Sequence, residues 1–260
     1  MTRATTTFDP RTAPLADDAL RGRVIAITGP TAGYGRALAF ECMRRGAEVI
    51  LIGRNVKKLE ALHAELCARR ASDATPPPEP VIAPLDFEKA VAADYDAIAD
   101  AIGQRFGRLD GLVLNAAILG QLSPIERHDV PLWVRVMHVN VTAPFALTQV
   151  LLPQLQASPD ASIVCISSGV GRTPRAYWGA YAVSKSALEG FAGVLADELE
   201  KTHVRVNTLD PGRMRTAMRR QAYPSEDVET LPAPESVTGP CIALLGAAAR
   251  GVTGGRFQAQ

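Results

Sequence analysis

Two side chains in the second half of the chain have the spacing needed for proton transfer. Tyr181 and Lys185 lie four residues apart in the run AYWGAYAVSK. In a helix such residues share a face, so the lysine ammonium would stand beside the phenol and favour its ionised form. A free tyrosine, with a pKa near about 10, exchanges protons poorly at neutral pH, so a lowered pKa would help proton transfer to or from a carbinol. The expected chemistry is acid–base catalysis at a carbon–oxygen bond.

A serine precedes this pair at a position where doubly wound sheets bind their ligands. The β-type run SIVCIS ends at Ser167 and Ser168, and Tyr181 follows thirteen residues after Ser168. A hydroxyl at the carboxyl end of a strand can hydrogen-bond a substrate oxygen. The YxxxK spacing alone is common on exposed helices, so the prediction depends on the serine, the tyrosine and the lysine together.

A glycine-rich turn near the start of the chain has the pattern of a phosphate-binding loop. The run GRVIAITG predicts a strand, and TGPTAGYG leads from it into an Ala-rich helix. Glycines let the backbone lie against a ligand without a Cβ in the way, and the helix start offers unpaired N–H groups to a pyrophosphate. An ordinary strand-to-helix turn is the alternative. The cofactor-binding residues predicted here are Gly29, Thr31, Gly33, Tyr34 and Gly35.

The second predicted strand, AEVILIG, ends without the acid that many NAD-binding domains place there. That position is Gly53, and Arg54 and Asn55 follow it. A carboxylate would accept hydrogen bonds from the adenosine ribose and repel a 2′-phosphate, whereas a planar guanidinium suits a phosphate. The residues therefore favour NADP(H) over NAD(H) as the cofactor, with a solvated loop arginine as the alternative.

Short β-rich runs alternate with helical stretches along the chain, which is typical of a parallel sheet with crossover helices. We expect strands at GRVIAITG, AEVILIG, VIAPLDF, GLVLN, SIVCIS, VRVNTL and RFQ. We expect helices over residues 36–45, 56–70, 92–106, 131–156, 180–200 and 235–249, and a loop at ATPPPEP. The prediction is an α/β fold: one Rossmann-type domain over residues 21–260, with a doubly wound parallel sheet of about seven strands and helices on both faces.

The composition excludes several classes of partner. The 260 residues include 28 Lys and Arg against 27 Asp and Glu, which gives a formal net charge of +1. No global field would gather nucleic acid or anionic lipid. No run approaches the roughly 18 consecutive apolar residues of a membrane span. We therefore expect neither nucleic acid nor membrane as a partner.

The start of the chain and its cysteines both indicate a cytoplasmic protein. Residues 1–20 carry two prolines and three acids, lack the basic start and apolar core of a secretory signal, and predict a flexible arm. The four cysteines lie far apart with no CxxC pair, and the histidines are not at ligand spacing with them. We expect each cysteine to be a small buried hydrophobe, with no disulfide and no metal site.

Together these motifs resemble the short-chain dehydrogenase/reductase family over nearly the whole chain, from Gly22 to Gln260. Runs such as LIGRN and VGRTPRAYWGAYA further resemble the YciK-like branch of that family. The resemblance implies an enzyme that transfers a hydride between a nicotinamide and a carbonyl or alcohol carbon of a small molecule. The matching pieces, in the family's order, are TGPTAGYG, Asp86 after the third strand, LNAAIL after the fourth, Asn140 in VMHVN, the Ser168, Tyr181 and Lys185 set, and DPGRMRT.

The resemblance also implies roles for single residues. Tyr181 would exchange the proton, Ser168 would orient the carbonyl or hydroxyl, and Lys185 would lower the tyrosine pKa and bind the nicotinamide ribose. Asn140 would hold a water in the proton relay. The other implied cofactor contacts are Asp86 at the adenine, Asn115, Ala116 and Ala117 at the adenosine ribose, and Pro211, Gly212 and Thr216 at the carboxamide.

Two residues depart from the family's pattern. Ala117 stands where the NNAG motif has glycine, and Tyr34 stands where a small aliphatic residue is common. We expect the extra methyl of Ala117 to alter the fit of the cofactor. Tyr34 is expected to stack beside the pyrophosphate or to narrow the entrance.

Two other functions share parts of this pattern. A catalytically silent regulatory protein that binds NADP(H) would need the cofactor pocket and not a proton relay, so the complete Ser168, Tyr181, Lys185 and Asn140 set argues against it. A nucleotide-sugar epimerase or dehydratase shares YxxxK, but such chains usually carry TGxxGxxG and a longer substrate domain, and this chain shows neither.

The segment over residues 213–235 is polar and interrupted by prolines, as expected of a lid over the active site. Its first part is basic and its second part acidic, so it either binds an anionic substrate or neutralises itself. Tyr177 and Trp178 are expected to form an apolar wall of the site, or to be packing residues or subunit contacts. The helices over residues 131–156 and 180–200 carry extra apolar faces, which favours a homodimer or homotetramer.

Overall fold

The computed structural model describes residues 8–70 and 77–260 and contains one seven-stranded parallel sheet. The strand order is β3-β2-β1-β4-β5-β6-β7, so the direction of winding reverses between β1 and β4. This confirms the predicted doubly wound α/β fold. The strands are β1 (Val24–Thr28), β2 (Glu48–Gly53), β3 (Val81–Pro84), β4 (Gly111–Leu114), β5 (Ala161–Ile166), β6 (Val204–Asp210) and β7 (Arg256–Gln258).

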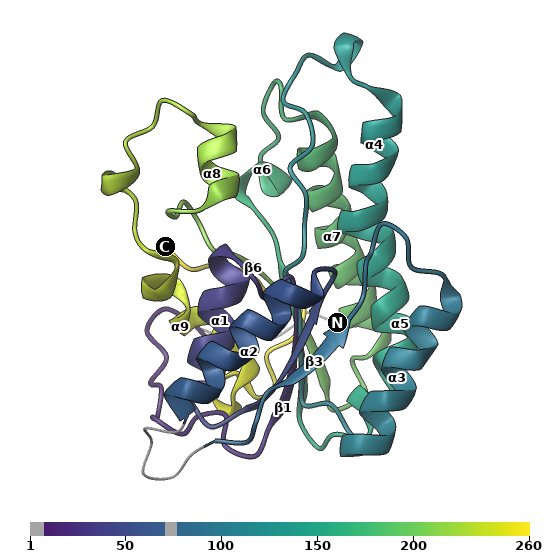
Figure 1. Ribbon diagram of the computed structural model, residues 1–260, viewed down its shortest axis with the longest axis vertical. Coiled ribbons are helices and arrows are strands. Elements are labelled where there is room, and N and C mark those ends of the chain that lie inside the picture. Colours follow the sequence, from purple (N-terminus) through teal and green to yellow (C-terminus); the bar gives the residue numbers. More distant parts are fainter. Residues whose placement is uncertain (1–7, 71–76) are drawn as a thin grey trace.

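Helices cover both faces of the sheet (Figure 1). On one face lie α1 (Gly33–Arg44), α2 (Val56–Arg70) and α9 (Gly239–Leu245); on the other lie α3 (Ala92–Phe106), α5 (Ala143–Gln156) and α7 (Gly179–Glu198). The shorter helices α4 (Val130–Met137), α6 (Gly169–Arg172) and α8 (Ala217–Ala222) lie toward the carboxyl ends of the strands. Single 3-10 turns cover Ile125–Arg127, Val228–Thr230, Pro234–Val237 and Ala247–Ala249.

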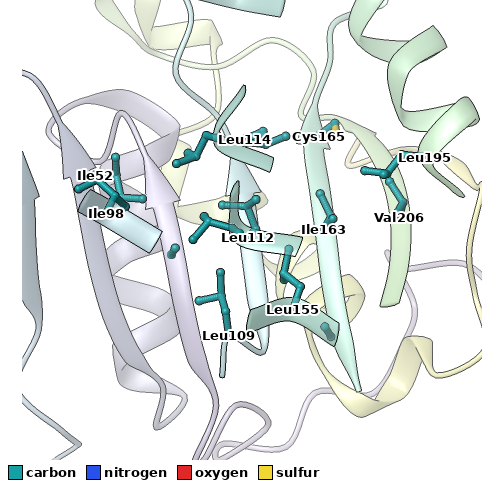
Figure 2. Packing of buried hydrophobic residues seen from close by; sticks show 14 of the residues in the cluster. Ile52, Ile98, Leu109, Leu112, Leu114, Leu155, Ile163, Cys165, Leu195 and Val206 are labelled. Atoms are coloured by element: carbon teal, nitrogen blue, oxygen red, sulfur yellow. The ribbon is translucent and has the colours of Figure 1, made fainter. Parts of the chain in front are cut away.

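The strands have continuous apolar sequences because both faces of the sheet are covered. Every residue of β1, β4, β5 and β6 is buried. Figure 2 shows the layer between the sheet and α3, α5 and α7, where Leu112 and Ile163 project from the central strands toward Leu155, and Leu195 meets Val206. This packing fixes the carboxyl ends of β1, β4, β5 and β6 relative to one another.

Two predicted helices are interrupted. The helix expected over residues 131–156 contains a π-helical turn, His138–Thr142, between α4 and α5. Such turns often occur at functional sites. The helix expected over residues 235–249 is α9 flanked by the 3-10 turns Pro234–Val237 and Ala247–Ala249.

The described part of the expected N-terminal arm is packed against the domain. Leu20 is fully buried, and its N–H donates to the Arg45 carbonyl at 3.0 Å. Phe8 meets Phe257 edge to face, with ring centroids 5.8 Å apart. Residues 1–7 lie outside the described residues. Residues 8–20 are therefore not the loose segment that their prolines and acids suggested.

The helical stretch Val130–Gln156 is long and apolar enough, by length and composition, to cross a membrane. Core helices of globular proteins meet the same criterion. Here Val136, Leu147 and Leu151 of that stretch are fully buried inside the fold, whereas Val130, Val134 and Phe145 are exposed.

Candidate functional site

A cleft of about 500 Å³ opens at the carboxyl ends of β1, β4, β5 and β6. It lies at the point where the strand order reverses, where doubly wound sheets bind ligands. Of the predicted site residues, Gly35 and Asn140 do not line it. The predicted residues that line it are Gly29, Thr31, Gly33, Tyr34, Arg54, Asn55, Asp86, Asn115, Ala116, Ala117, Ser168, Tyr181, Lys185, Pro211, Gly212 and Thr216.

The glycine loop is shaped by close approaches of backbone to backbone. Gly29 has φ +64°, a conformation that favours glycine. A Cβ on Gly35 would overlap the Gly29 carbonyl oxygen and stand 2.5 Å from the Asn115 amide nitrogen. Gly35 is therefore needed for packing behind the loop rather than for contact with a ligand. Gly29 and Gly33 both line the cleft at the start of α1, where the free N–H groups of a helix suit an anion such as a pyrophosphate.

Thr28 and Asn115 join the loop to β4. The Thr28 hydroxyl accepts from the N–H groups of Asn115 and Ala116, each at 2.9 Å. The Asn115 amide donates to the carbonyls of Thr28 (3.0 Å) and Gly29 (3.2 Å). Asn115 thus positions the glycine loop. The sequence interpretation missed Thr28, although a hydroxyl residue at the end of a strand that precedes a glycine loop was a readable signal.

The expectation for Tyr34 is wrong. Its side chain is buried in the core beneath α1, and its hydroxyl donates to the Val237 carbonyl at 3.2 Å. The ring therefore anchors α1 to the 3-10 turn Pro234–Val237. It neither stacks beside the phosphate loop nor narrows the entrance.

Arg54 lies at the far end of the cleft with a carboxylate that the sequence interpretation overlooked. Its Nη1 donates to Oε1 of Glu88 at 2.6 Å, while its side chain remains 58% exposed. Glu88 also receives two hydrogen bonds from Arg135, at 2.8 and 2.9 Å. The hydrogen bonds from Arg135 hold the pKa of Glu88 below its usual value. Lys58 lines the same part of the cleft, and Asp86 and Glu88 do so as well, so two cations stand there with two acids.

Tyr181 is buried in the cleft wall, and the Ser168 side chain lies beside it. Burial raises the pKa of Tyr181 to about 12, and the nearby Ser168 hydroxyl opposes this rise. We expected Lys185 to lower this pKa, but the lysine Nζ lies 5.8 Å from the centroid of the phenol ring and points to the Ile166 carbonyl. The expected lowering is absent from this structure.

Lys185 is a buried cation at the base of the cleft. Its Nζ donates to the Ile166 carbonyl at 2.7 Å. Burial lowers the pKa of Lys185 to about 8, although the nearby Asp210 carboxylate favours its charged form. Asp210 also lines the cleft, and the sequence interpretation assigned it no role. Its place as the first residue of DPG, at the end of a predicted strand, could have indicated a position in the cleft.

Asn140 occupies the π-helical turn and makes three hydrogen bonds through its side chain. Its Oδ1 accepts from the Ile118 N–H at 2.8 Å, and its Nδ2 donates to the Ile118 carbonyl at 2.9 Å and to Ser184 Oγ at 3.0 Å. The Ser184 hydroxyl donates to the Tyr181 carbonyl at 2.8 Å. The side chain thus connects the segment after β4 to the helix of Tyr181. These contacts use both Nδ2 hydrogens, whereas Oδ1 can still accept a second hydrogen bond, as a relay water would require.

The side of the cleft nearest Tyr181 is aromatic and apolar. Trp178 lies between Tyr181 and Tyr223, with ring centroids 5.8 and 5.9 Å apart, and Met218 packs against the same cluster. Trp178 therefore forms the expected wall. Tyr177 is exposed and has φ +73°, and it does not line the cleft.

Two of the four arginines in the segment over residues 213–235 are paired with acids of the same segment. Arg219 makes a two-pronged hydrogen bond to Glu226, with both contacts at 2.5 Å, and its guanidinium stacks on Tyr223. Arg215 forms an ion pair with Glu229 at 3.2 Å. These pairs favour the self-neutralising alternative over an anion site.

We expected no histidine to lie at metal-ligand spacing from a cysteine, but one pair does. His63 and Cys67 are four residues apart on α2, and their Nδ1 and Sγ atoms are 3.7 Å apart. Glu79 approaches the same histidine. The spacing of His63 and Cys67 could be seen in the sequence, but the contact between Glu79 and His63 depends on the fold.

Known proteins with the same sequence pattern and fold were found by comparison. The family model for short chain dehydrogenase matches residues 23–227. The oxidoreductase YciK of Escherichia coli (strain K12) is 41% identical over 243 residues, which cover 94% of each chain. A short chain dehydrogenase structure from Pseudomonas syringae is 43% identical with TM-score 0.91, covering 95% of this chain and 98% of that one. An Escherichia coli CFT073 short chain dehydrogenase complexed with NADPH is 41% identical with TM-score 0.90, covering 94% and 99%. The chain belongs to the short-chain dehydrogenase/reductase family of oxidoreductases.

Proposed function

We propose that this protein is an NADP(H)-dependent oxidoreductase that acts on a carbonyl or alcohol carbon of a small molecule. The observation that carries the proposal is that Tyr181, with the Ser168 side chain beside it, lines the same cleft as Lys185 and the glycine loop. A cofactor pocket alone would serve a regulatory protein, whereas this pair also provides acid–base chemistry.

The cleft can hold the cofactor from the glycine loop to the catalytic pair. Gly29 and Gly33 would accept the pyrophosphate, and Lys185 would bind the nicotinamide ribose. When bound, the nicotinamide supplies or accepts a hydride. Arg54 and Lys58 suit a 2′-phosphate because both are cations at the adenosine end. The similar short chain dehydrogenases from Escherichia coli CFT073 and Shigella flexneri, solved with NADPH and NADP, support this preference.

The shifted pKa values of Tyr181 and Lys185 favour carbonyl reduction over alcohol oxidation. With its pKa raised to about 12, Tyr181 keeps its proton at neutral pH and can donate it to a developing alkoxide. The Ser168 hydroxyl would hold the substrate oxygen beside the phenol. Lys185, with its pKa lowered to about 8, is charged at neutral pH and would stabilise the phenolate that remains after the transfer.

The apolar wall of Trp178, Met218 and Leu119 suits a substrate with an apolar or aromatic body next to its carbonyl. The pairing of Arg219 with Glu226 leaves that cation occupied, so an anionic group is not required of the substrate.

We further propose that the protein works in the cytoplasm as a homodimer or homotetramer without nucleic-acid or membrane partners. The support is the balanced net charge of +1 and the exposed apolar side chains of α5 and α7, namely Phe145, Val183 and Val194. Sedimentation measurements over a range of protein concentrations would decide the oligomeric state.

The test is a panel of aromatic and aliphatic carbonyl compounds assayed with NADPH and with NADH. We expect turnover with NADPH at lower KM than with NADH. In Arg54→Ala the KM for NADPH should rise about tenfold or more, because a charged hydrogen-bond partner of a phosphate is worth about 1.5–3 kcal/mol, while the KM for NADH should hardly change. Glu88→Gln should lower the KM for NADPH by releasing Arg54. Equal use of both cofactors by the wild type would contradict the preference, and tight NADPH binding without turnover of any carbonyl would favour the regulatory alternative.

A further inference from the structure

Three side chains that can ligate a metal ion meet between α2 and the segment before β3, and none of them lines the cleft. His63 and Cys67 lie on α2, whose first turn borders the cleft at Lys58 and whose last turn reaches the opposite edge of the sheet. Glu79 precedes β3, which starts at that edge. One ligand atom from each of the three residues lies within 4.8 Å of the others. The cluster is therefore separate from the catalytic machinery.

The two helical residues are on one face because they are four positions apart. Cys67 Sγ lies 3.7 Å from Nδ1 and 3.8 Å from Nε2 of His63, and His63 Nε2 lies 3.4 Å from Glu79 Oε1. The side chains are only partly covered, so an ion can enter from solvent: that of Glu79 is 60% exposed and that of His63 27%.

These separations match those of ligands around a tetrahedral zinc ion. With Zn–S of about 2.3 Å and Zn–N of about 2.0–2.1 Å, tetrahedral angles place sulfur and nitrogen about 3.6 Å apart. With Zn–O of about 2.0–2.2 Å, nitrogen and oxygen lie about 3.4 Å apart. The 3.8 Å and 3.4 Å distances measured from His63 Nε2 lie close to both values, but Sγ is almost equidistant from Nδ1 and Nε2, so the imidazole ring must rotate for Nε2 to point at the ion.

The chemical nature of the ligands selects the ion. A thiolate and an imidazole favour zinc and similar transition metals over magnesium or calcium, which prefer oxygen. We propose that His63, Cys67 and Glu79 bind one zinc-class divalent cation, with solvent in the fourth position. Binding releases the Cys67 proton as the thiolate forms.

This cation would join α2 to the start of β3 at the outer edge of the sheet. Arg70, the last residue of α2, already donates to the Pro77 carbonyl in the same region. A metal held by both segments stabilises the folded state in proportion to its affinity. The site is thus a structural one, and its occupancy should not alter the chemistry in the cleft.

The experiment uses tag-free, metal-free, full-length protein titrated with Co²⁺ as a spectroscopic substitute and with Zn²⁺ by calorimetry. We expect one equivalent of Co²⁺ to bind with a thiolate-to-cobalt charge-transfer absorption that Zn²⁺ displaces, and Zn²⁺ to raise Tm. Cys67→Ser should abolish the absorption. His63→Gln and Glu79→Gln should weaken binding at least about tenfold.

The matched control is His203→Gln, which removes an exposed histidine from another part of the chain and should bind the metal as the wild type does. Absence of stoichiometric binding, or the same absorption in Cys67→Ser, would overturn the proposal. Binding of NADPH, measured in parallel, should be the same in all four variants. A failure of the metal site is thus distinguishable from a failure of the proposed enzymatic function.

Discussion

Replacing Lys185 with methionine should stabilise the cofactor-free protein near neutral pH, and this gain should fade as the pH rises. Lys185 is buried, and burial lowers its pKa from 10.5 in the unfolded chain to about 8 in the folded protein. Methionine has a similar length without the charge. The variant should lose turnover because the buried cation beside Tyr181 is gone.

The magnitude follows from the pKa shift. Because the folded pKa is lowered, the unfolded chain binds more protons between pH 8 and 10.5, so the wild type gains stability as the pH rises through this window. Below pH 8 the full penalty applies, which is about 3 kcal/mol for a shift of this size. From pH 7.5 to pH 10 the stability difference between variant and wild type should shrink by about 2 kcal/mol. The lost hydrogen bond to Ile166 costs about 1 kcal/mol at every pH and does not affect this slope.

The assay is urea unfolding of both proteins at several pH values between 7.5 and 10, with the exposed Lys201→Met as control. The control should differ from the wild type by a constant amount at every pH. A Lys185→Met stability difference that is flat across this range would refute the claim that the lysine is a buried cation with a lowered pKa.

Three further outcomes are expected. The kcat/KM for carbonyl reduction should fall as the pH rises through about 8, because Lys185 loses its charge while Tyr181 keeps its proton; a profile that stays flat to pH 10 would contradict this. Tyr34→Phe should cost about 1 kcal/mol in urea unfolding and leave the KM for NADPH unchanged, since only the bond to Val237 is lost; a large rise in that KM would place the ring at the cofactor instead. Gly35→Ala should destabilise the fold by about 1–3 kcal/mol and weaken NADPH binding measured by fluorescence, because its Cβ has no room; wild-type stability and affinity would show that the loop adjusts freely.

The sequence predicted the elements best where local signals and packing agree. The helices Val56–Arg70 and Ala92–Phe106 have the predicted bounds. Asn55 caps the first of them by accepting from the Lys58 N–H, and Gly107 ends the second in the left-handed conformation. The glycine loop was predictable because its spacing is set by backbone geometry within a few residues.

The parts that sequence reasoning missed depend on residues far apart in the chain. The π-helical turn around Asn140 is held by Ile118, and the Tyr34 ring is held by Val237, 203 residues away. Spacing placed Tyr181 and Lys185 on one helix face but could not show their burial, which reverses the expected direction of the tyrosine pKa. The pairing of Arg54 with Glu88 likewise needs β2 and the segment after β3 to lie side by side.

The most direct test of the account is the turnover of a responsive carbonyl by Tyr181→Phe, with NADPH binding measured in the same preparation. The phenylalanine keeps the ring and its contact with Trp178 and removes only the hydroxyl beside Ser168. We expect NADPH affinity and Tm close to those of the wild type and a kcat lower by about 10²-fold or more, as expected when the proton donor is lost. A variant that binds NADPH and reduces the carbonyl at the wild-type rate would contradict the assignment of Tyr181 as the proton donor.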